Sequence, residues 1–476
     1  MSSKLSLHPD RLFSSAPTER AIARRLYSEI KDLPIISPHG HTDPGWFADN
    51  TNFANPAEMF IKPDHYVFRM LYSLGVPLQA LGIARRDVSV AEVDSGAVDP
   101  KEIWRLFAKH YYALRATPSA YWLNHVFSEV FGIDIKLDER SADFYYETID
   151  RQLQSEAFKP RALFERFNIE ALATTESPLD PLCQHQAIHN SGWGGRVITT
   201  FRPDPVMDPE YEGFTENLCQ LSELTGLDCH DYDNYIGALK QRRCFFKQMG
   251  ATATDHGHPS AFTANLDPGA AQNLFKKAVQ RQCTAQEAEL FRGHMLVEMA
   301  AMSLEDGLVM QIHPGSFRNH NRDLFQLFGR DKGADIPTRT EYVSALKPLL
   351  DLYGNEPGFT AIVFTLDESS YSRELAPLAG HYPALKIGPP WWFHDSVEGM
   401  KRFRRAITET AGFYNLVGFN DDTRAFLSIP ARHDMARRMD CAFLAELVGQ
   451  HRLDEDEAAE IAVDLTYHLV KQAYRL

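Results

Sequence analysis

The chain has 476 residues, of which 44% are hydrophobic and 24% are charged, and its formal net charge is −15. This length can bury a large core, and because the sequence holds no long apolar run, no membrane-spanning helix is expected. The acidic balance argues against a general affinity for nucleic acid, whose footprint on a protein is a basic stripe.

The N-terminus and the cysteines both favour a cytoplasmic protein. The opening residues, MSSKLSLHPDRLF, contain one lysine and no apolar segment, unlike a secretory signal. The six cysteines are widely spaced and form no CxxC pair, so neither a zinc finger nor a disulfide framework is indicated. We expect free thiols, and a homo-oligomer is compatible with the sequence.

The first predicted strand, residues 33–36, is followed directly by SPHGHTDP. Alternate residues of a strand point to the same face, so His39 and His41 are expected to converge on one spot. Two convergent imidazoles indicate a metal site. The alternative is a polar turn shaped by Pro38 and Gly40, in which the histidines are incidental.

Eight short β-rich runs end abruptly at polar residues, and helical periodicity separates most of them. The runs are residues 33–36, 170–173, 196–200, 251–254, 308–312, 360–364, 385–387 and 415–419. This alternation predicts a (β/α)8 TIM-type barrel, whose active site is built from loops at the carboxyl ends of the strands. An open doubly wound sheet would normally have a glycine-rich turn after its first strand, and HGHTDPGW lacks that spacing.

One connection is too long for a simple loop. Residues 42–168 read mostly as helices, including 100–112 and 142–154, and a structureless loop of this length would be unusual. We expect a helical insertion subdomain after the first strand, covering the mouth of a single barrel that spans residues 1–476. The tail, residues 430–476, is also predicted to be helical.

The first and eighth strands of a barrel are neighbours, so His39 and His41 are expected beside Asp421 and Asp422. Two imidazoles and one carboxylate suit zinc or a similar divalent ion, with open positions left for water or substrate. Taken alone, Asp422 could instead be a turn or helix-cap residue. The joint arrangement favours the metal.

Eight separated motifs resemble those of the uronate isomerase family, a branch of the amidohydrolase superfamily. Their order and spacing cover the chain from about residue 33 to the C-terminus. They are SPHGHTDP (37–44), DHYVFRMLYSLGV (64–76), TTESPLD (174–180), FRPDPV (201–206), TDHGHP (254–259), LVMQIHPGSFRNHN (308–321), WWFHD (391–395) and GFNDDTRAFLS (418–428). The resemblance implies an amidohydrolase-type barrel.

The resemblance also implies a ligand set for the metal, namely His39, His41 and Asp422. Asp422 is preferred because the pattern D-[ST]-R-x-F falls on residues 422–426, although Asp421 remains a rival. The superfamily often holds a second metal through a lysine or glutamate at the fourth strand end, and TDHGHP contains neither. One divalent ion is therefore expected, with zinc as the first candidate.

The activity that the resemblance implies is the interconversion of aldose and ketose hexuronates: glucuronate with fructuronate, or galacturonate with tagaturonate. Asp422 would take the C5 hydroxyl proton as the sugar ring opens, with the metal assisting. His65 and Tyr66 are candidates for moving a proton from C2 to C1, and Arg424 could lower the pKa of Tyr66. Without the resemblance, an aromatic residue in a helix is more often part of a core.

Further residues are expected to bind this small-molecule substrate. Arg202 of FRPD could hold the C6 carboxylate with its planar fork of donors, although surface arginines are usually solvated. The others could instead pack in the core, shape a loop or, for His313, ligate the metal or satisfy a barrel hydrogen bond. They are Trp391, Trp392, His313, Arg318 and Asn319.

Two other functions stay open at this point. A zinc-dependent hydrolase acting on a sugar lactone or amide would use the same metal ligands to activate water. A non-catalytic barrel would bind without turnover. The DHY motif and the two arginines favour the isomerase. A hydride shift between C1 and C2 would reduce His65 and Tyr66 to positioning groups, and the preferred epimer is not predicted.

Overall fold

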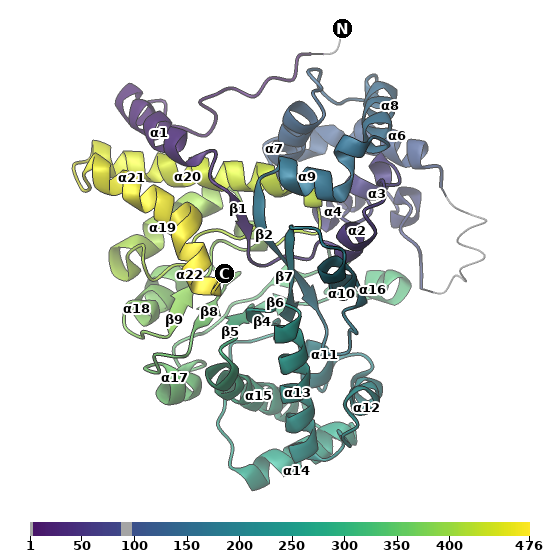
Figure 1. The fold of residues 1–476 in the computed structure, drawn as a ribbon, viewed down its shortest axis with the longest axis vertical. Helices are drawn as coiled ribbons and strands as arrows, with labels where there is room; N and C mark the ends of the chain where they lie inside the picture. The colour runs from purple at the N-terminus through teal and green to yellow at the C-terminus, as the bar shows by residue number, and fades with distance from the viewer. Residues whose placement is uncertain (1–2, 87–97) are drawn as a thin grey trace.

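A curled parallel sheet with helices around it forms the centre of the fold (Figure 1). The computed structural model describes residues 3–86 and 98–476. Its parallel strands pair in the order β1-β2-β3-β4-β5-β8-β9. They are β1 (Ile35–Ser37), β2 (Ile169–Glu176), β3 (Arg196–Phe201), β4 (Ala253–His256), β5 (Val309–Ile312), β8 (Ala361–Val363) and β9 (Leu385–Ile387). The first seven predicted strands are confirmed.

The predicted eighth strand at 415–419 is wrong as a regular strand. Within the described residues this segment forms only an isolated parallel bridge, to Ile387. Gly418 has a φ of +75°, in the left-handed region that favours glycine, and this backbone conformation interrupts an extended strand.

The same segment nevertheless bridges the two ends of the sheet. On one side the Ile387 N–H donates to Asn415 O (3.1 Å), and on the other the His41 N–H donates to Thr423 O (3.0 Å). The chain after Asn415 therefore occupies the position of the eighth strand, between β9 and β1. The fold is a (β/α)8 barrel, with this segment in place of one regular strand.

Helices fill the long connection between β1 and β2. They are α2 (Pro44–Asp49), α3 (Pro56–Phe60), α4 (His65–Ser73), α6 (Pro100–His110), α7 (Pro118–His125), α8 (Ala142–Leu153) and α9 (Pro160–Arg166), with the short turns η1 (Leu78–Leu81), η2 (Tyr111–Leu114), η3 (Val126–Val130) and η4 (Glu156–Phe158). Several begin with proline, whose fixed φ suits the first helical position and whose missing N–H would have no partner there. Trp104, Phe107 and Phe127 are fully buried between them. The predicted helices at 100–112 and 142–154 are confirmed.

The later strands are joined by further helices that pack around the sheet. These are α10 (Cys183–Asn190), α11 (Asp204–Met207), α12 (Phe214–Thr225), α13 (Tyr232–Gln248), α14 (Pro268–Val279), α15 (Ala285–Asp306), α16 (Arg322–Phe328), α17 (Lys347–Tyr353), η5 (Tyr371–Leu375), α18 (Ala376–Ala379), η6 (Trp392–His394) and α19 (Val397–Ala411). Between β5 and β8 the chain also forms a small antiparallel pair, β6 (Ser316–Phe317) with β7 (Ile336–Pro337). The loops that carry this pair reach the carboxyl ends of the strands.

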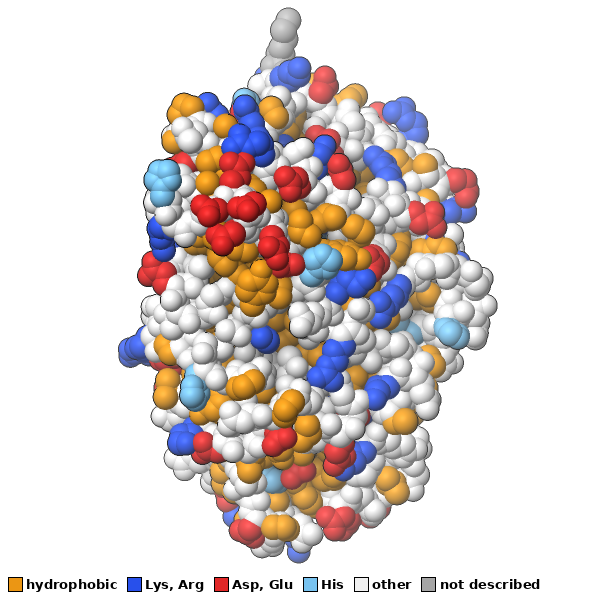
Figure 2. All heavy atoms as spheres, turned by 60° about the vertical axis from the view of Figure 1, so that its left-hand side comes forward, with side chains coloured by type: hydrophobic (Ala, Val, Ile, Leu, Met, Phe, Trp, Pro, Cys, Tyr) orange, Lys and Arg blue, Asp and Glu red, His pale blue; other side chains and the backbone are white. Residues whose placement is uncertain are grey.

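The two ends of the chain meet in one helical layer (Figure 1). Helix α1 (Pro17–Ile30) packs against α20 (Ile429–Gly449) and α21 (Glu455–Val463), and α20 also contacts α7 and β1. The tail is completed by η7 (Phe426–Ser428), η8 (Asp464–His468) and α22 (Leu469–Tyr474), so the predicted helical tail is confirmed. The face seen in Figure 2 mixes acidic, basic and apolar side chains. Among the described helices, none has the length and apolar character needed to cross a membrane.

Candidate active site

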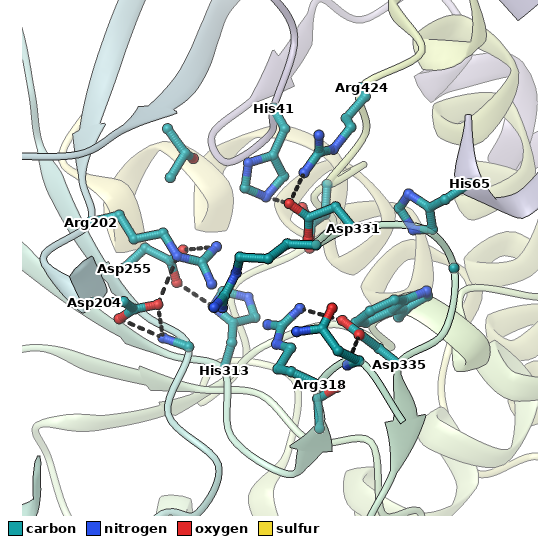
Figure 3. A pocket seen from close by; sticks show the side chains of 18 of the residues that line it. His41, His65, Arg202, Asp204, Asp255, His313, Arg318, Asp331, Asp335 and Arg424 are labelled. Carbon is teal, nitrogen blue, oxygen red and sulfur yellow. Dashed lines mark hydrogen bonds and ion pairs between the residues drawn. The ribbon is translucent and has the colours of Figure 1, made fainter. Parts of the chain in front are cut away.

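The carboxyl ends of the strands open into a cavity of about 950 Å³. All the residues predicted to bind the metal, to act in catalysis or to contact the substrate line this cavity. Figure 3 shows that many of their side chains point toward one another from different elements. The sequence therefore identified a set of side chains that the fold brings together.

His39 and His41 follow β1 and converge on Asp422. The Nε2 atoms of His39 and His41 lie 3.5 and 3.2 Å from Asp422 Oδ1. Burial disfavours the charged form of Asp422, but the two imidazoles outweigh this effect and hold the pKa of its carboxyl below the usual range. Burial lowers the pKa of His39 to about 4, so its imidazole is neutral at pH 7. Neutral imidazoles and an ionised carboxylate are the forms that bind a metal.

These three side chains fit a divalent ion. One ligand atom from each lies within 4.8 Å of the others. Two nitrogens and one oxygen form a donor set that suits zinc and several related ions. A cation at this point would also balance the buried charge of Asp422.

The rival carboxylate, Asp421, lies elsewhere. Its Oδ2 is 3.0 Å from His433 Nε2 on α20, and its side chain is fully buried. The backbone explains why the neighbours diverge, since Asp422 has a φ of +39° and its side chain is turned toward β1. Of the two aspartates, only Asp422 is grouped with His39 and His41.

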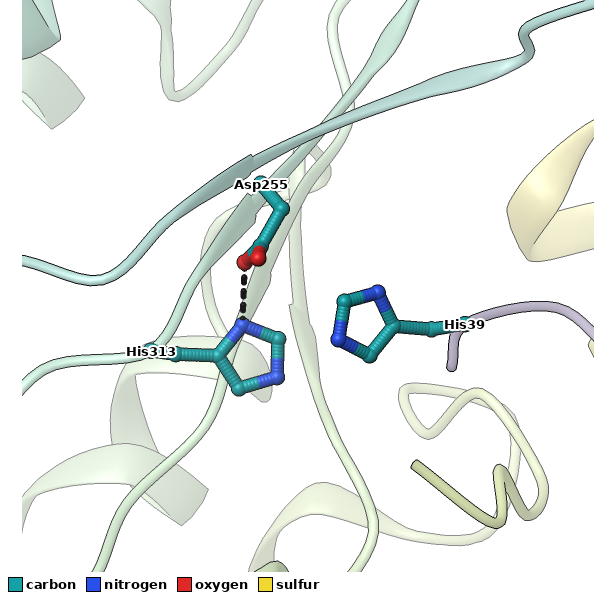
Figure 4. A group of neighbouring side chains, drawn as sticks. All are labelled: His39, Asp255 and His313. Atoms are coloured by element: carbon teal, nitrogen blue, oxygen red, sulfur yellow. Dashed lines mark hydrogen bonds and ion pairs between the residues drawn. The ribbon is translucent and has the colours of Figure 1, made fainter. Parts of the chain in front are cut away.

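A second acidic group lies near His39 (Figure 4). Asp255, at the end of β4, accepts a hydrogen bond from His313 Nδ1 at 2.6 Å. The ring of His313 stacks on that of His39 with 4.8 Å between centroids, and His313 Nε2 is buried without a hydrogen-bond partner among the described residues. His39, Asp255 and His313 thus form another group able to hold a cation. Sequence reasoning missed Asp255, although its position before His256 at a strand end was a usable signal.

Arg202 lies at the cavity wall between two carboxylates. Its Nε donates to Asp204 Oδ2 at 2.9 Å, and its terminal nitrogen is 3.0 Å from Asp255 Oδ2. A Cβ added at Gly257 would lie 2.2 Å from the other terminal nitrogen, so the guanidinium can occupy this place only because residue 257 is glycine. Its carboxylate partners hold Arg202 in one orientation at the wall.

His65 and Tyr66 form the start of α4 and reach the cavity from the helical connection. Their rings stack with 5.0 Å between centroids. Burial lowers the pKa of His65 to about 3, with a further lowering from Arg424. Burial raises the pKa of Tyr66 well above its ordinary value. At neutral pH both side chains are therefore uncharged.

The expectation that Arg424 lowers the pKa of Tyr66 is wrong. The guanidinium that lies near the Tyr66 ring belongs to Arg432 of α20, at 5.5 Å from the centroid, and its effect is smaller than that of burial. Arg424 instead faces Asp331, with 3.5 Å between the charged atoms. The sequence could not reveal that Arg432, and not Arg424, lies beside Tyr66, because Arg432 is inside a helix eight residues further along the chain.

The remaining predicted residues, Trp391, Trp392, Arg318 and Asn319, also line the cavity. Trp391 lies edge-on to His313 with 4.7 Å between centroids, and Trp392 lies edge-on to His65 at 5.5 Å. Arg318 sits 5.5 Å from the Trp392 ring centroid and pairs with Asp335 at 2.9 Å. The backbone N–H of Asn319 also donates to Asp335, at 2.7 Å. Asp335 thus anchors the loop that presents Arg318 and Asn319.

Among the other acids of the cavity that were missed, Glu176 and Asp331 have clearly shifted pKa values. Burial raises the pKa of Glu176, at the end of β2, to about 7, and its carboxylate accepts a hydrogen bond from Thr199. Burial also acts to raise the pKa of Asp331, but Arg424 and other arginines outweigh it and lower the value to about 2. Glu176 stands in the quoted motif TTESPLD and could have been noticed. Asp331 lies in a loop whose path no local pattern predicts.

Comparisons with known proteins extend over the whole fold. A family model described as glucuronate isomerase matches residues 16–474. Proteins named uronate isomerase from Xanthomonas euvesicatoria pv. vesicatoria and Rhizorhabdus wittichii are 65% and 63% identical over 475 and 472 residues, which cover 100% and 99% of both chains. The solved structure of glucuronate isomerase from Caulobacter crescentus is similar with a TM-score of 0.97 and 58% identity, covering 99% of this chain and 98% of that one.

Proposed function

The chain belongs to the glucuronate isomerase family, and we propose that the cavity at its strand ends is the place where it interconverts glucuronate and fructuronate. The enzyme is an aldose–ketose isomerase of uronates. The observation that carries this conclusion is the match at 63–65% identity over the full length of the curated relatives. The hydrolase alternative is not favoured, because these relatives are named as isomerases.

We assign one divalent ion, with zinc as the first candidate, to His39, His41 and Asp422. The support is the donor set already described, with its ligand atoms within 4.8 Å of one another. When bound, such an ion supplies a Lewis acid that favours ionisation of a sugar hydroxyl. The lowered pKa of Asp422 keeps its carboxylate ionised, and because it also weakens the base, proton transfer from the C5 hydroxyl would depend on the ion lowering the pKa of that hydroxyl. Asp422 is therefore assigned as the base that takes the C5 hydroxyl proton when the cyclic sugar opens.

Arg202 is assigned to the C6 carboxylate of the substrate. Its guanidinium is held at the cavity wall by Asp204 and Asp255, which prevents it from folding away. A guanidinium so fixed binds a carboxylate with less loss of conformational entropy than a free one. Arg318 and Asn319, with Trp391 and Trp392, are proposed to contact the sugar as well, since they line the same cavity.

The proton transfer between C2 and C1 is assigned to His65 and Tyr66. The neutral imidazole of His65 is the form that accepts the C2 proton, while the phenol of Tyr66 is the form that donates one to O1. An enediol results. His65 then returns its proton to C1 and the O2 proton passes to Tyr66, which yields the ketose and restores both side chains. Arg424 is assigned to the oxygens that exchange these protons, since it lines the cavity and its charge acts on His65.

The helical connection 42–168 is proposed to act as a subdomain that closes one side of the cavity of a single barrel. The support is that His65 and Tyr66 of α4 line the cavity together with residues from the strand ends. Closure would exclude water from an enediol, which protects it from loss or side reaction. A cytosolic location is inferred as well, because all six cysteines are unpaired.

The test is conversion of substrate in D2O. Zinc-loaded protein is incubated with glucuronate and, separately, with galacturonate, and the products are followed by proton NMR. We expect glucuronate to form fructuronate with deuterium at C1, since protons on His65 exchange with solvent. His41→Asn serves as the matched inactive control. Ketose without deuterium would refute the assigned proton transfer, and no conversion of either acid by protein that holds zinc would refute the site assignment.

A further inference from the structure

A second cluster of metal-ligating side chains lies next to Arg202 and shares no residue with the metal site assigned to His39, His41 and Asp422. Asp204 opens α11, His256 ends β4, and His258 follows two residues later. One ligand atom from each lies within 4.8 Å of the others, and the side chains are buried. We propose that Asp204, His256 and His258 hold a second divalent transition-metal ion, of the kind represented by Zn²⁺.

The cluster contains buried imidazole nitrogens that have no hydrogen-bond partner among the described residues. Both ring nitrogens of His258, and Nδ1 of His256, are buried without a hydrogen-bond partner. A buried polar atom left in this way costs about 1–3 kcal/mol, so native structures usually satisfy it. His258 Nε2 lies 3.9 Å from Asp204 Oδ1, too far for a hydrogen bond. Two ligand atoms held by a tetrahedral zinc ion at about 2.0–2.2 Å lie about 3.3–3.6 Å apart, so an ion between them would draw these two atoms slightly closer.

The charges around the cluster leave room for a cation. Asp204 and Asp255 share the single guanidinium of Arg202, at 2.9 and 3.0 Å, which leaves one negative charge in excess. His256 and His258 are both buried, with 0% and 3% of their surface exposed. Arg292, the other arginine that acts on His258, is itself paired with Asp208 at 2.7 Å. Two buried imidazoles beside a pair of carboxylates that share one guanidinium therefore form a site that suits a divalent ion.

The ion would act on the substrate site through Asp204. This carboxylate accepts hydrogen bonds from Arg202 Nε and from the backbone N–H of Gly257, at 2.9 and 3.1 Å. An ion that fixes Asp204 therefore also fixes the orientation of Arg202, which makes His256 and His258 positioning residues. This consequence rests on the proposed function, while the binding of the ion does not. Loss of the ion should raise the KM for glucuronate more than it lowers kcat.

The test counts metal ions in the full-length protein without substrate. Protein stripped with a chelator is reloaded with Zn²⁺, passed through a desalting column and analysed by mass spectrometry of the elements. We expect about two ions per chain in the wild type, and about one each in His258→Gln and His41→Asn. The double variant should bind none. His185→Gln removes another buried imidazole, one that bonds to Thr174, and should still bind two.

The outcomes separate clearly. One ion in the wild type, with none in His41→Asn, would overturn the second site, and so would two ions in His258→Gln. If His258→Gln does not fold, as judged by circular dichroism and gel filtration, His256→Gln takes its place. X-ray absorption of zinc-loaded His41→Asn gives an independent readout, in which absence of imidazole around the remaining zinc contradicts the proposal. Because this experiment measures metal content and not turnover, a negative result would refute the second metal site without bearing on the isomerase activity.

Discussion

Replacement of Arg202 by lysine is the sharpest test of the substrate assignment. Lysine keeps one positive charge beside Asp204 and Asp255, so the two buried carboxylates are not left without a cation. It lacks the planar fork of donors, however, and offers a single point charge. The substitution therefore removes the contact to substrate while disturbing the protein charges as little as possible.

The size of the effect follows from how the guanidinium is already engaged. Two of its three nitrogens are within hydrogen-bond distance of protein carboxylates, at 2.9 and 3.0 Å, which leaves one nitrogen free of them for the substrate. A hydrogen bond to a charged group contributes about 1.5–3 kcal/mol. At about 1.4 kcal/mol per factor of ten, its loss lowers kcat/KM roughly 10- to 150-fold. The C6 carboxylate is remote from C1 and C2, so the change should appear in KM and not in kcat.

Steady-state kinetics with glucuronate measure this directly. Arg404→Lys is the matched control, because Arg404 is also buried and paired with an aspartate, Asp440 at 2.7 Å, but does not line the cavity. We expect its KM to equal that of the wild type. A KM for Arg202→Lys within twofold of the wild-type value, in protein with native circular dichroism, would refute the role given to Arg202.

Three further predictions concern the other cavity residues. Asp422→Asn should lower kcat by about 10²- to 10⁴-fold, as expected for loss of a general base, and should also lower the zinc content; a variant with nearly normal turnover would contradict both roles. Tyr66→Phe removes the hydroxyl but keeps the ring contacts, so kcat should fall at least about 10²-fold with little change in KM. A fall in kcat that is accompanied by a clear drop in melting temperature would indicate a structural role instead. Burial raises the pKa of Glu176 from 4.5 to about 7, so the folded state binds this proton more tightly than the unfolded state, and its contribution to stability is lost as the pH rises through 7. Glu176→Gln should therefore melt at a higher temperature than the wild type at pH 8 but not at pH 5, and identical pH profiles of the melting temperature would exclude this account.

The barrel and the convergence of its first and last strand ends could be predicted because the rules involved are local or topological. Alternation along a strand placed His39 and His41 on one side, and closure of eight strands placed Asp422 beside them. Both rules need only residue spacing. The observed separations of 3.5 and 3.2 Å from Asp422 agree with this reasoning.

Details that depend on backbone torsion could not be predicted. The eighth strand fails at Gly418, where φ is +75°, and the same stretch has a φ of +39° at Asp422. This second torsion separates the directions of Asp421 and Asp422, which the sequence left as rivals. A segment rich in β-forming residues does not reveal which of its residues adopts a positive φ.

Contacts across the fold were also beyond the sequence. Tyr66 meets Arg432, not Arg424, because α20 passes beside the helical connection, and nothing in the spacing of residues indicates that crossing. Asp331 and Asp335 come from the irregular loops between β6 and β7, whose path depends on packing against other segments. Asp255 differs from these, because its position at a strand end was visible and only its importance was overlooked.

The arginines at the cavity wall share one arrangement that bears on specificity. Arg202, Arg318 and Arg424 are each paired with aspartates, at 2.9 to 3.5 Å, before any substrate arrives. Such pairing cancels much of the long-range positive potential, so the cavity does not attract anions in general. The hydrogen-bond donors of the arginines are nevertheless held in fixed directions. A ligand binds well when its carboxylate and hydroxyl oxygens accept from these donors at the same time. Recognition of a hexuronate then depends on the geometry of the donors more than on net charge, and the acids that hold the arginines contribute to specificity by fixing that geometry.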